Sequence, residues 1–141
     1  MSTLNRFKIA QDSVYKDVIA ELKAGKKQSH WMWFIFPQIS GLGKSPMSQK
    51  YAIHNLETAK MYLDEQPLAS RLEECTKLVL SHENIPLADI FGEIDTLKFR
   101  SSMTLFDWAK RDFIFEEALN LFCKGKRCAK TIHILKNEIS K

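Results

Sequence analysis

Apolar side chains recur at helical spacing along almost the whole chain, and this periodicity limits the fold more than any other feature of the sequence. Tyr15, Val18, Ile19 and Leu22 give the i, i+3, i+4, i+7 pattern of one buried helix face. Comparable stripes run through residues 68–79, 97–108, 115–122 and 132–139. Convincing period-two alternation and Asn-Gly or Asp-Gly turns are missing. We therefore expect a mostly α, compact orthogonal bundle of seven to nine helices, with little or no β structure and residues 1–141 forming a single domain.

Several residues are suited to mark the ends of these helices. The candidate N-caps are Asp12 or Ser13, Ser45 with Pro46 after it, Asn55, and Asp95. Ser45 and Pro46 would open a helix that runs through Tyr51 and Ile53 to about Asn55. Gly25 is expected to stop the helix that begins near Tyr15, because glycine tolerates the left-handed conformation that ends many helices.

Composition excludes several classes of protein. A chain of 141 residues, 45% of them hydrophobic, can bury a core without disulfides or a structural metal. Cys75, Cys123 and Cys128 form no CxxC pair, and no secretory signal precedes them, so we expect a cytoplasmic protein without a disulfide framework. The longest apolar run, residues 31–36, is far short of the roughly 20 residues needed to span a bilayer, so no membrane partner is expected. The four histidines show no HxH or HExxH spacing, and we expect neither a metal site nor a cofactor.

Positive charge is concentrated around one unusual segment. The formal net charge is only +4. Residues 22–56, however, contain no Asp or Glu and five lysines, which are Lys23, Lys26, Lys27, Lys44 and Lys50. This basic region includes the aromatic and glycine-containing sequence SHWMWFIFPQISGLGKS, residues 29–45. The coincidence strengthens the case for an anionic partner, and a merely solvated surface is the alternative.

The glycine-containing part of this segment has two interpretations. Gly43, Lys44 and Ser45 match the end of a P-loop, but Gln38 stands where that motif needs glycine and no buried strand precedes it, which excludes a P-loop nucleotidase. Gly41 and Gly43 can nevertheless take left-handed dihedrals that turn successive N–H groups toward an anion, at the start of a helix. The alternative is a flexible turn followed by a capped helix.

The aromatic part also has two interpretations. On a helix, Trp31 and Trp33 point about 200° apart, so one of them is expected to be exposed. An indole next to a basic loop is suited to stack on a nucleobase or a nicotinamide ring. His30 is a candidate general acid or base, because its reference pKa is about 6.5. Ordinary core packing and a structural histidine are the alternatives.

A second polar cluster lies in DTLKFRSSMTLF, residues 95–106. On a helix, Asp95, Lys98 and Ser102 share one side, and Ser101 and Thr104 lie within a turn of them. Small hydroxyl residues lower helix propensity, which favours a use for them. Asp95 would act as an acid or base, and the lysine and hydroxyls would donate to a ribose or a phosphate. The alternative is an N-cap, a local ion pair and hydroxyls bonded to the backbone.

Four motifs carry a resemblance to a known family: RFKIAQDSVY, GKKQSHWMWFIFPQISGLGKSPMSQKYAI, RLEECT and IFGEIDTLKFRSSMTLF. Over about residues 6–122 they resemble domain-of-unknown-function family 1810, whose members are small α-helical proteins. More distantly the chain is similar to the NADAR, or YbiA-like, superfamily, whose characterised members cleave N-glycosidic bonds in NAD and ADP-ribose metabolism.

The distant resemblance implies particular roles for residues of this chain. Trp31 or Trp33 would stack the base, the loop 41–45 would bind phosphate, and Lys98 with Asp95 would face the sugar. The superfamily's glutamate-bearing helix has no evident match. Gln11 would occupy a comparable place, where its amide cannot act as a base.

Together these features predict a protein that binds a phosphorylated, nucleotide-like ligand of the ADP-ribose or NAD type. An N-glycosidic hydrolase would use Asp95 and His30 as its catalytic pair. A non-catalytic module for nucleotides or nucleic acid, and a protein-interaction domain built on residues 31–36, are the alternatives. The expected ligand-binding residues are Gln11, Trp31, Trp33, Gln38, Gly41, Gly43, Lys44, Ser45, Tyr51, Lys98, Ser101, Ser102 and Thr104. The sequence leaves open the oligomeric state and whether the two polar clusters meet in space.

Overall fold

The computed structural model describes residues 4–139, and this part of the chain contains ten helices and no strand. The helices are α1 (Asn5–Asp12), α2 (Tyr15–Ala24), α3 (Met32–Ile35), α4 (Pro46–Lys50), α5 (Leu56–Asp64), α6 (Leu68–Leu80), α7 (Leu87–Phe91), α8 (Glu93–Ala109), α9 (Ile114–Cys123) and α10 (Ala129–Ile139). The predicted mostly α fold is confirmed. The count exceeds seven to nine because single-turn helices such as α3 and α7 are too short to show a helical period in the sequence.

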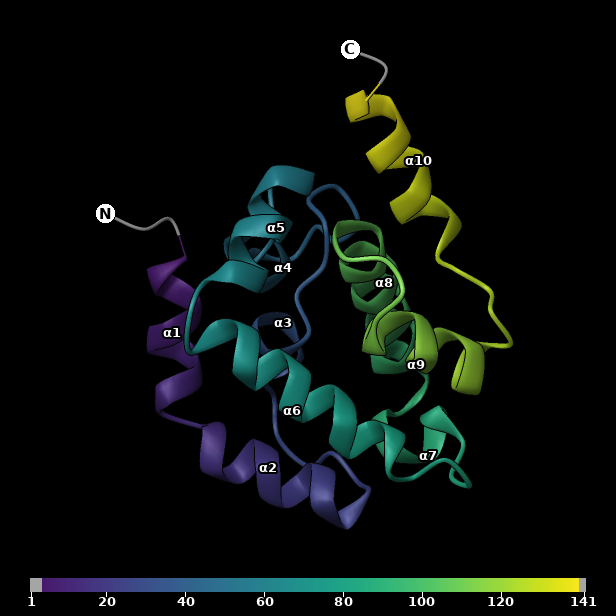
Figure 1. Ribbon diagram of the computed structural model, residues 1–141. Coiled ribbons are helices and arrows are strands. Elements are labelled where there is room, and N and C mark those ends of the chain that lie inside the picture. The colour runs from purple at the N-terminus through teal and green to yellow at the C-terminus, as the bar shows by residue number, and fades with distance from the viewer. Residues whose placement is uncertain (1–3, 140–141) are drawn as a thin grey trace.

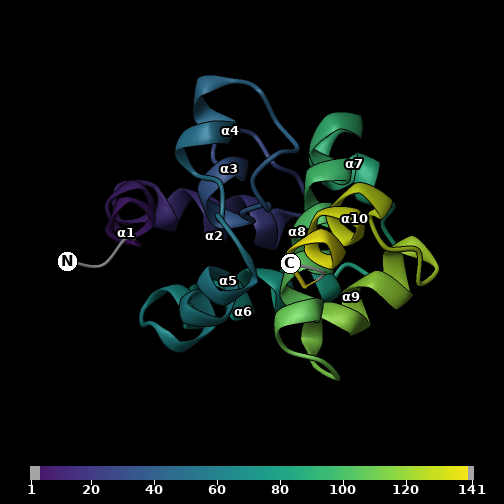
Figure 2. The same ribbon diagram turned by 90° about the horizontal axis from the view of Figure 1, so that it is seen from above.

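The longest helix, α8, forms the centre of the bundle, with contacts to α3, α5, α7, α9 and α10 (Figures 1 and 2). From Phe99 to Asp107 it buries nearly every side chain. Three of these are the small hydroxyl residues Ser101, Ser102 and Thr104. The Ser101 and Thr104 hydroxyls donate to the carbonyls one turn earlier in the helix, which satisfies them where water has no access. A helix surrounded by others in this way cannot show a simple amphipathic pattern.

The aromatic segment around α3 lies in the core. Trp31 is fully buried, whereas Trp33 is half-buried, which confirms that the two indoles do not face the same way. Phe36 packs edge-to-face against Phe91 and Phe99, with ring centroids 5.9 and 5.0 Å away. These contacts fix the segment against α7 and α8, and they bring its polar neighbours close to the start of α8.

Three of the predicted helix-end residues are confirmed. The Ser45 hydroxyl accepts from the Ser48 N–H at 3.1 Å, with Pro46 at the first helical position. The Asn55 side chain accepts from the Thr58 N–H at 2.8 Å. Gly25 ends α2 with a left-handed φ of 74°.

Other predicted helix ends are wrong. Val14, not Asp12 or Ser13, precedes α2, because Asp12 pairs with Arg71 at 2.8 Å and Ser13 bonds back to a carbonyl of α1. Asp95 is not an N-cap either. The helix already begins at Glu93, which places Asp95 inside the first turn with its carboxylate facing two lysines.

The helix opened by Ser45 is shorter than predicted and ends at Lys50. Ile53 is instead drawn into an isolated parallel bridge with Ile39. Its N–H donates to the Gln38 carbonyl and its own carbonyl accepts from Ser40, both at 2.8 Å. Residues 51–53 are buried in the core, and this burial stabilises the chain more than extending the helix through them would. Among residues 4–139, no helix has the length and apolarity required to cross a bilayer.

Candidate functional site

A hollow of about 520 Å³ lies where the loop before α3 meets the start of α8. Its floor includes Met32 and Phe91, both buried. The full lining is Lys27, His30, Met32, Trp33, Phe91, Gly92, Glu93, Ile94, Asp95 and Lys98. The two polar clusters of the sequence therefore meet here, and they contribute four predicted site residues, which are His30, Trp33, Asp95 and Lys98.

One carboxylate connects two lysines at this hollow. Lys27 Nζ lies 3.0 Å from Asp95 Oδ2, and Lys98 Nζ lies 3.5 Å from Asp95 Oδ1. Each lysine also lies over an indole: Lys27 Nζ is 5.2 Å from the Trp31 ring centroid, and Lys98 Nζ is 5.1 Å from that of Trp33. We call these five residues the lysine–tryptophan cluster. It holds two positive charges against one negative charge.

The N-terminus of α8 adds polar backbone groups to the same place. Gly92 is the N-cap residue, with a φ of 83°, and it carries no side chain that could cap the helix. The first helical hydrogen bond runs from the Thr96 N–H to the Gly92 carbonyl at 3.0 Å, so the preceding N–H groups lie outside the helical ladder. A helix N-terminus of this length favours negative charge nearby.

Glu21, in the last turn of α2, holds in place the loop that brings Lys27 to the hollow. Its carboxylate accepts from the N–H groups of Gln28 and Ser29 at 2.6 and 2.9 Å, from the Ser29 hydroxyl, and from Trp31 Nε1 at 3.0 Å. The Lys27 N–H donates to a carbonyl of α7 at 2.7 Å and completes the attachment. Burial alone would raise the pKa of Glu21, but these hydrogen bonds outweigh it and lower the pKa to about 2.

Glu21 therefore gives the stability of this region a predictable pH dependence. Its folded-state pKa lies below the ordinary value of 4.5, so its contribution is complete above about pH 4.5 and is lost as the pH falls toward 2. We expect Glu21→Gln to cost about 1–2 kcal/mol at pH 7, the scale of hydrogen bonds to a charged group, and clearly less at pH 3. Urea unfolding at both values tests this, with the exposed Glu83→Gln as the surface-charge control. A cost for Glu21→Gln that stays constant between pH 7 and 3 would contradict the assignment.

The glycine loop lies elsewhere. Gly41, with a φ of 102°, borders a different hollow of about 340 Å³ beside α10. A side chain at Gly43 would begin 2.5 Å from Ser48 Cβ, so close packing against α4 explains this glycine. Ser45 caps α4, and Lys44 is exposed while its carbonyl accepts from a side chain of α4. None of these four residues lines the hollow at the start of α8.

The remaining predicted ligand-binding residues lie in the body of the fold. Trp31 has no exposed surface, and Tyr51 is buried with its ring packed on Phe7 and Phe34. The Gln38 carbonyl belongs to the isolated bridge. The other four residues of this group are also buried: Gln11, Ser101, Ser102 and Thr104. None of these residues lines the hollow at the start of α8, although Trp31 lies behind it, against Lys27.

Lys27 and Glu21 are polar residues of this region that are not among the site residues predicted from the sequence. Lys27 belongs to the basic stretch between residues 22 and 56, so a signal for it was present. Glu21 had none, because its four donors come from a loop that only the fold brings back to α2.

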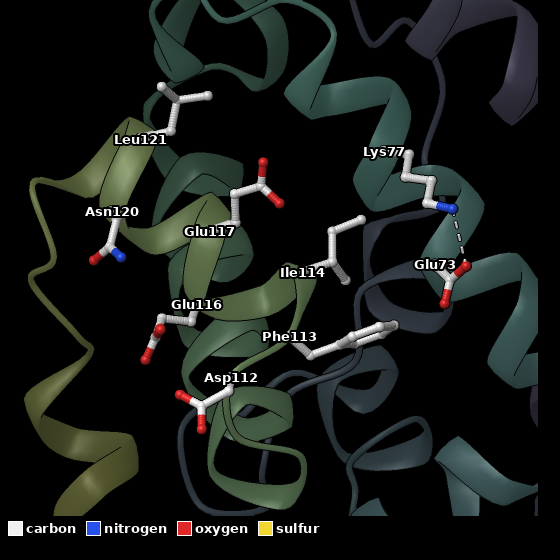
Figure 3. Close-up of a pocket in the computed structure, with 9 residues that line it drawn as sticks. All are labelled: Glu73, Lys77, Asp112, Phe113, Ile114, Glu116, Glu117, Asn120 and Leu121. Atoms are coloured by element: carbon white, nitrogen blue, oxygen red, sulfur yellow. Dashed lines mark ion pairs between the residues drawn. The ribbon is translucent and has the colours of Figure 1, made fainter.

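A larger hollow, of about 810 Å³, lies between α6 and α9 and contains none of the predicted site residues (Figure 3). Phe113 and Ile114 lie between carboxylates that belong to Glu73, Asp112, Glu116 and Glu117. Lys77 is the only basic residue of its lining and pairs with Glu73 at 3.1 Å. This charge repels phosphates, so the larger volume is the less suitable place for an anionic ligand. In the part of the chain that is described, no three His, Cys, Asp or Glu side chains gather as a metal site would require.

The fold and the hollow define a small, all-helical protein with a cleft of lysine and tryptophan at the start of its central helix. The chain belongs to DUF1810, a family described as proteins of unknown function, whose model matches residues 1–135. A crystal structure of the conserved hypothetical protein Rv1873 from Mycobacterium tuberculosis is similar to it at 44% identity and a TM-score of 0.92. The match covers 94% of this chain and 96% of that one. A comparison with curated proteins finds no match.

Proposed function

We propose that the protein binds a small phosphorylated, nucleotide-like ligand, of the ADP-ribose or NAD type, in the hollow at the start of α8. The observation that carries the proposal is the lysine–tryptophan cluster, which two distant segments of the chain build together. Each ammonium group has three N–H donors, and Asp95 is the carboxylate that both of them share. A phosphate would bind to the donors that Asp95 leaves, with the N–H groups of the first turn of α8 beside it.

The rest of the hollow suits the base and sugar of such a ligand. Trp33 is half-buried, lines the hollow and offers an aromatic surface for stacking. A volume of about 520 Å³ lies in the usual range for small-molecule sites. Nucleic acid fits less well, because Glu93 and Asp95 line the same hollow as the two lysines and leave too little positive charge for a long run of phosphates.

A catalytic version of this function would be N-glycosidic hydrolysis, the activity that a distant relation to the NADAR superfamily, itself part of this proposal, would imply. The Asp95 carboxylate would stabilise the positive charge that develops on the sugar carbon, and His30 would transfer the proton. One observation favours binding without catalysis as the second candidate. Both oxygens of Asp95 are engaged by ammonium groups, so a ligand must move a lysine before the carboxylate reaches a sugar.

Thermal unfolding with ADP-ribose, AMP, ribose 5-phosphate and inorganic phosphate tests the binding site. A ligand at about 100 times its Kd adds roughly 2.7 kcal/mol, which raises the Tm by several degrees in a domain of this size. We expect ADP-ribose to give a larger shift than phosphate in the wild type. Trp33→Leu and Lys98→Gln should remove most of that shift, because they take away the stacking surface and one phosphate donor.

Lys44→Gln is the matched control, since it removes an exposed lysine of the same basic segment that lies outside the hollow. An equal loss in Lys44→Gln and Lys98→Gln, or no shift with any ligand, would contradict the proposed site. Incubation with a nucleoside substrate, followed by chromatography of the released base, separates the two versions. Turnover that Asp95→Asn abolishes would support hydrolysis, and binding without turnover would support the non-catalytic module.

A further inference from the structure

A second hollow, of about 430 Å³, lies on the other side of α8. It is enclosed by Thr96, Leu97 and Arg100 of that helix, by the loop between α6 and α7, and by the end of α9. On a helix, positions 97 and 100 point about 200° away from positions 95 and 98. The hollow is therefore separate from the lysine–tryptophan cluster, and nothing said of its ligand depends on the function proposed above.

Arg100 is an unusual residue for this position. Its Nε is buried and has no hydrogen-bond partner in the described part of the chain. None of the ion pairs among residues 4–139 includes its guanidinium, although it lines the hollow. A buried donor left without a partner costs free energy, and a guanidinium is the side chain best shaped to bind a carboxylate with two parallel hydrogen bonds.

The surroundings of Arg100 are mostly apolar. Pro86, Leu97 and Phe122 line the hollow with it. Cys123 also lines it, and the two groups are close enough to interact: burial raises the pKa of the Cys123 thiol, and the positive charge of Arg100 opposes that rise. One fixed cation among apolar walls suits a single negative charge on an apolar body. A polyphosphate would need more than one cation.

We propose that this hollow is a binding site for a small monocarboxylate with an apolar body. The carboxylate pairs with the guanidinium of Arg100, whose Nε is the donor left without a partner in the described residues. The apolar body lies against Pro86, Leu97 and Phe122. A phosphate monoester shares the anionic chemistry, but its second charge would find no second cation in the lining, which also includes Glu83.

Titration calorimetry with hexanoate, hexanol and inorganic phosphate tests this site on the full chain. We expect hexanoate to bind the wild type at least tenfold more tightly than hexanol, which has the same apolar body without the charge. Arg100→Gln should weaken the affinity for hexanoate at least tenfold. The affinity of Arg100→Lys should lie between those of the wild type and Arg100→Gln, because lysine keeps the charge but lacks the planar guanidinium. Lys98→Gln, on the opposite side of α8, should bind as the wild type does.

Protection of Cys123 gives a second measurement that needs no variant. Bound hexanoate should slow its alkylation by iodoacetamide at least threefold, as mass spectrometry of the Cys123 peptide would show. Cys128, which lies outside the hollow, serves as the internal control. Equal affinity for hexanoate and hexanol, unchanged hexanoate affinity in Arg100→Gln, or equal protection of Cys123 and Cys128 would each overturn the proposal. So would the absence of hexanoate binding at millimolar concentration.

Discussion

Replacing Gln11 by alanine is expected to destabilise the protein by about 3–5 kcal/mol, because it both opens a cavity and leaves buried polar groups without a hydrogen bond. The Gln11 amide donates to the Phe34 carbonyl at 2.8 Å and to the Tyr62 hydroxyl at 3.0 Å. Its oxygen accepts from Arg71 at 3.3 Å. The side chain is 1% exposed, so no water would replace it without rearrangement. Its removal takes this partner from the Phe34 carbonyl and the Tyr62 hydroxyl, which belong to two different helices and lie inside the core, whereas Arg71 keeps its ion pair with Asp12.

Urea unfolding of Gln11→Ala and Gln11→Met separates the two contributions. Methionine keeps most of the volume but makes no comparable hydrogen bonds, so we expect about 2–3 kcal/mol for Gln11→Met, the cost of the unsatisfied groups alone. The difference between the two variants measures the cavity. A cost below about 1 kcal/mol for Gln11→Ala would show that the network is not needed.

Replacing Asp107 by alanine is expected to cost about 3 kcal/mol, near the lower limit for breaking a buried ion pair. Asp107 is 1% exposed, and its Oδ2 lies 3.1 Å from Arg127 Nε and 3.5 Å from Arg111 Nη1. Arg127 also pairs with Glu116 at 3.5 Å and donates to the Gly125 carbonyl, in the connection that follows α9. The carboxylate thus attaches the connection between α9 and α10 to the central helix.

The two arginines provide the comparison for this prediction. Arg127→Ala should cost nearly as much as Asp107→Ala, because it leaves the buried carboxylate without its main partner. Arg111 is mostly exposed, with 59% of its side chain accessible, so Arg111→Ala should stay within about 1 kcal/mol of the wild type. Urea unfolding in low salt and in 1 M NaCl checks the ranking, and the cost of Arg127→Ala should survive the salt. Equal costs for the two arginines would mean that burial of Asp107 is not what gives the pair its strength.

The fold was predictable to the extent that local chemistry determines it. Asn55 and Ser45 are confirmed as caps because a capping side chain bonds to its own helix within three residues. The N-cap prediction at Asp95 is wrong because the interactions of this residue are not local. Its partner Lys27 lies far away in sequence, and Gly92, which begins the helix, offers no side chain to signal the start. The end of α4 depends on Ile53 pairing with Ile39, which no local pattern encodes.

The candidate site was predictable by residue type but not by place. His30 and Trp33 were candidates from one segment, and Asp95 and Lys98 from another, and only the packing of α3 on α8 shows that they line one hollow. The hydroxyls of Ser101 and Thr104 were equally polar candidates, yet they lie inside the bundle. A helix buried on almost every side has no polar face by which the sequence could separate ligand contacts from core contacts.

The bridge between Ile39 and Ile53 has a consequence for how the protein opens. The bridge joins the two ends of the loop between residues 39 and 53. Arg6 adds two further hydrogen bonds there, to the carbonyls of Lys50 at 2.7 Å and Ala52 at 2.9 Å. We call the bridge and these two hydrogen bonds the clasp. Beyond that clasp, the residues from Gly41 to Lys50 are exposed or half-buried and add little to the core. The loop can therefore unfold by itself, and its amides will exchange with solvent at a lower free energy than those of the clasp. A protease that cuts this loop would leave both segments of the clasp in place, so we expect the nicked protein to remain folded.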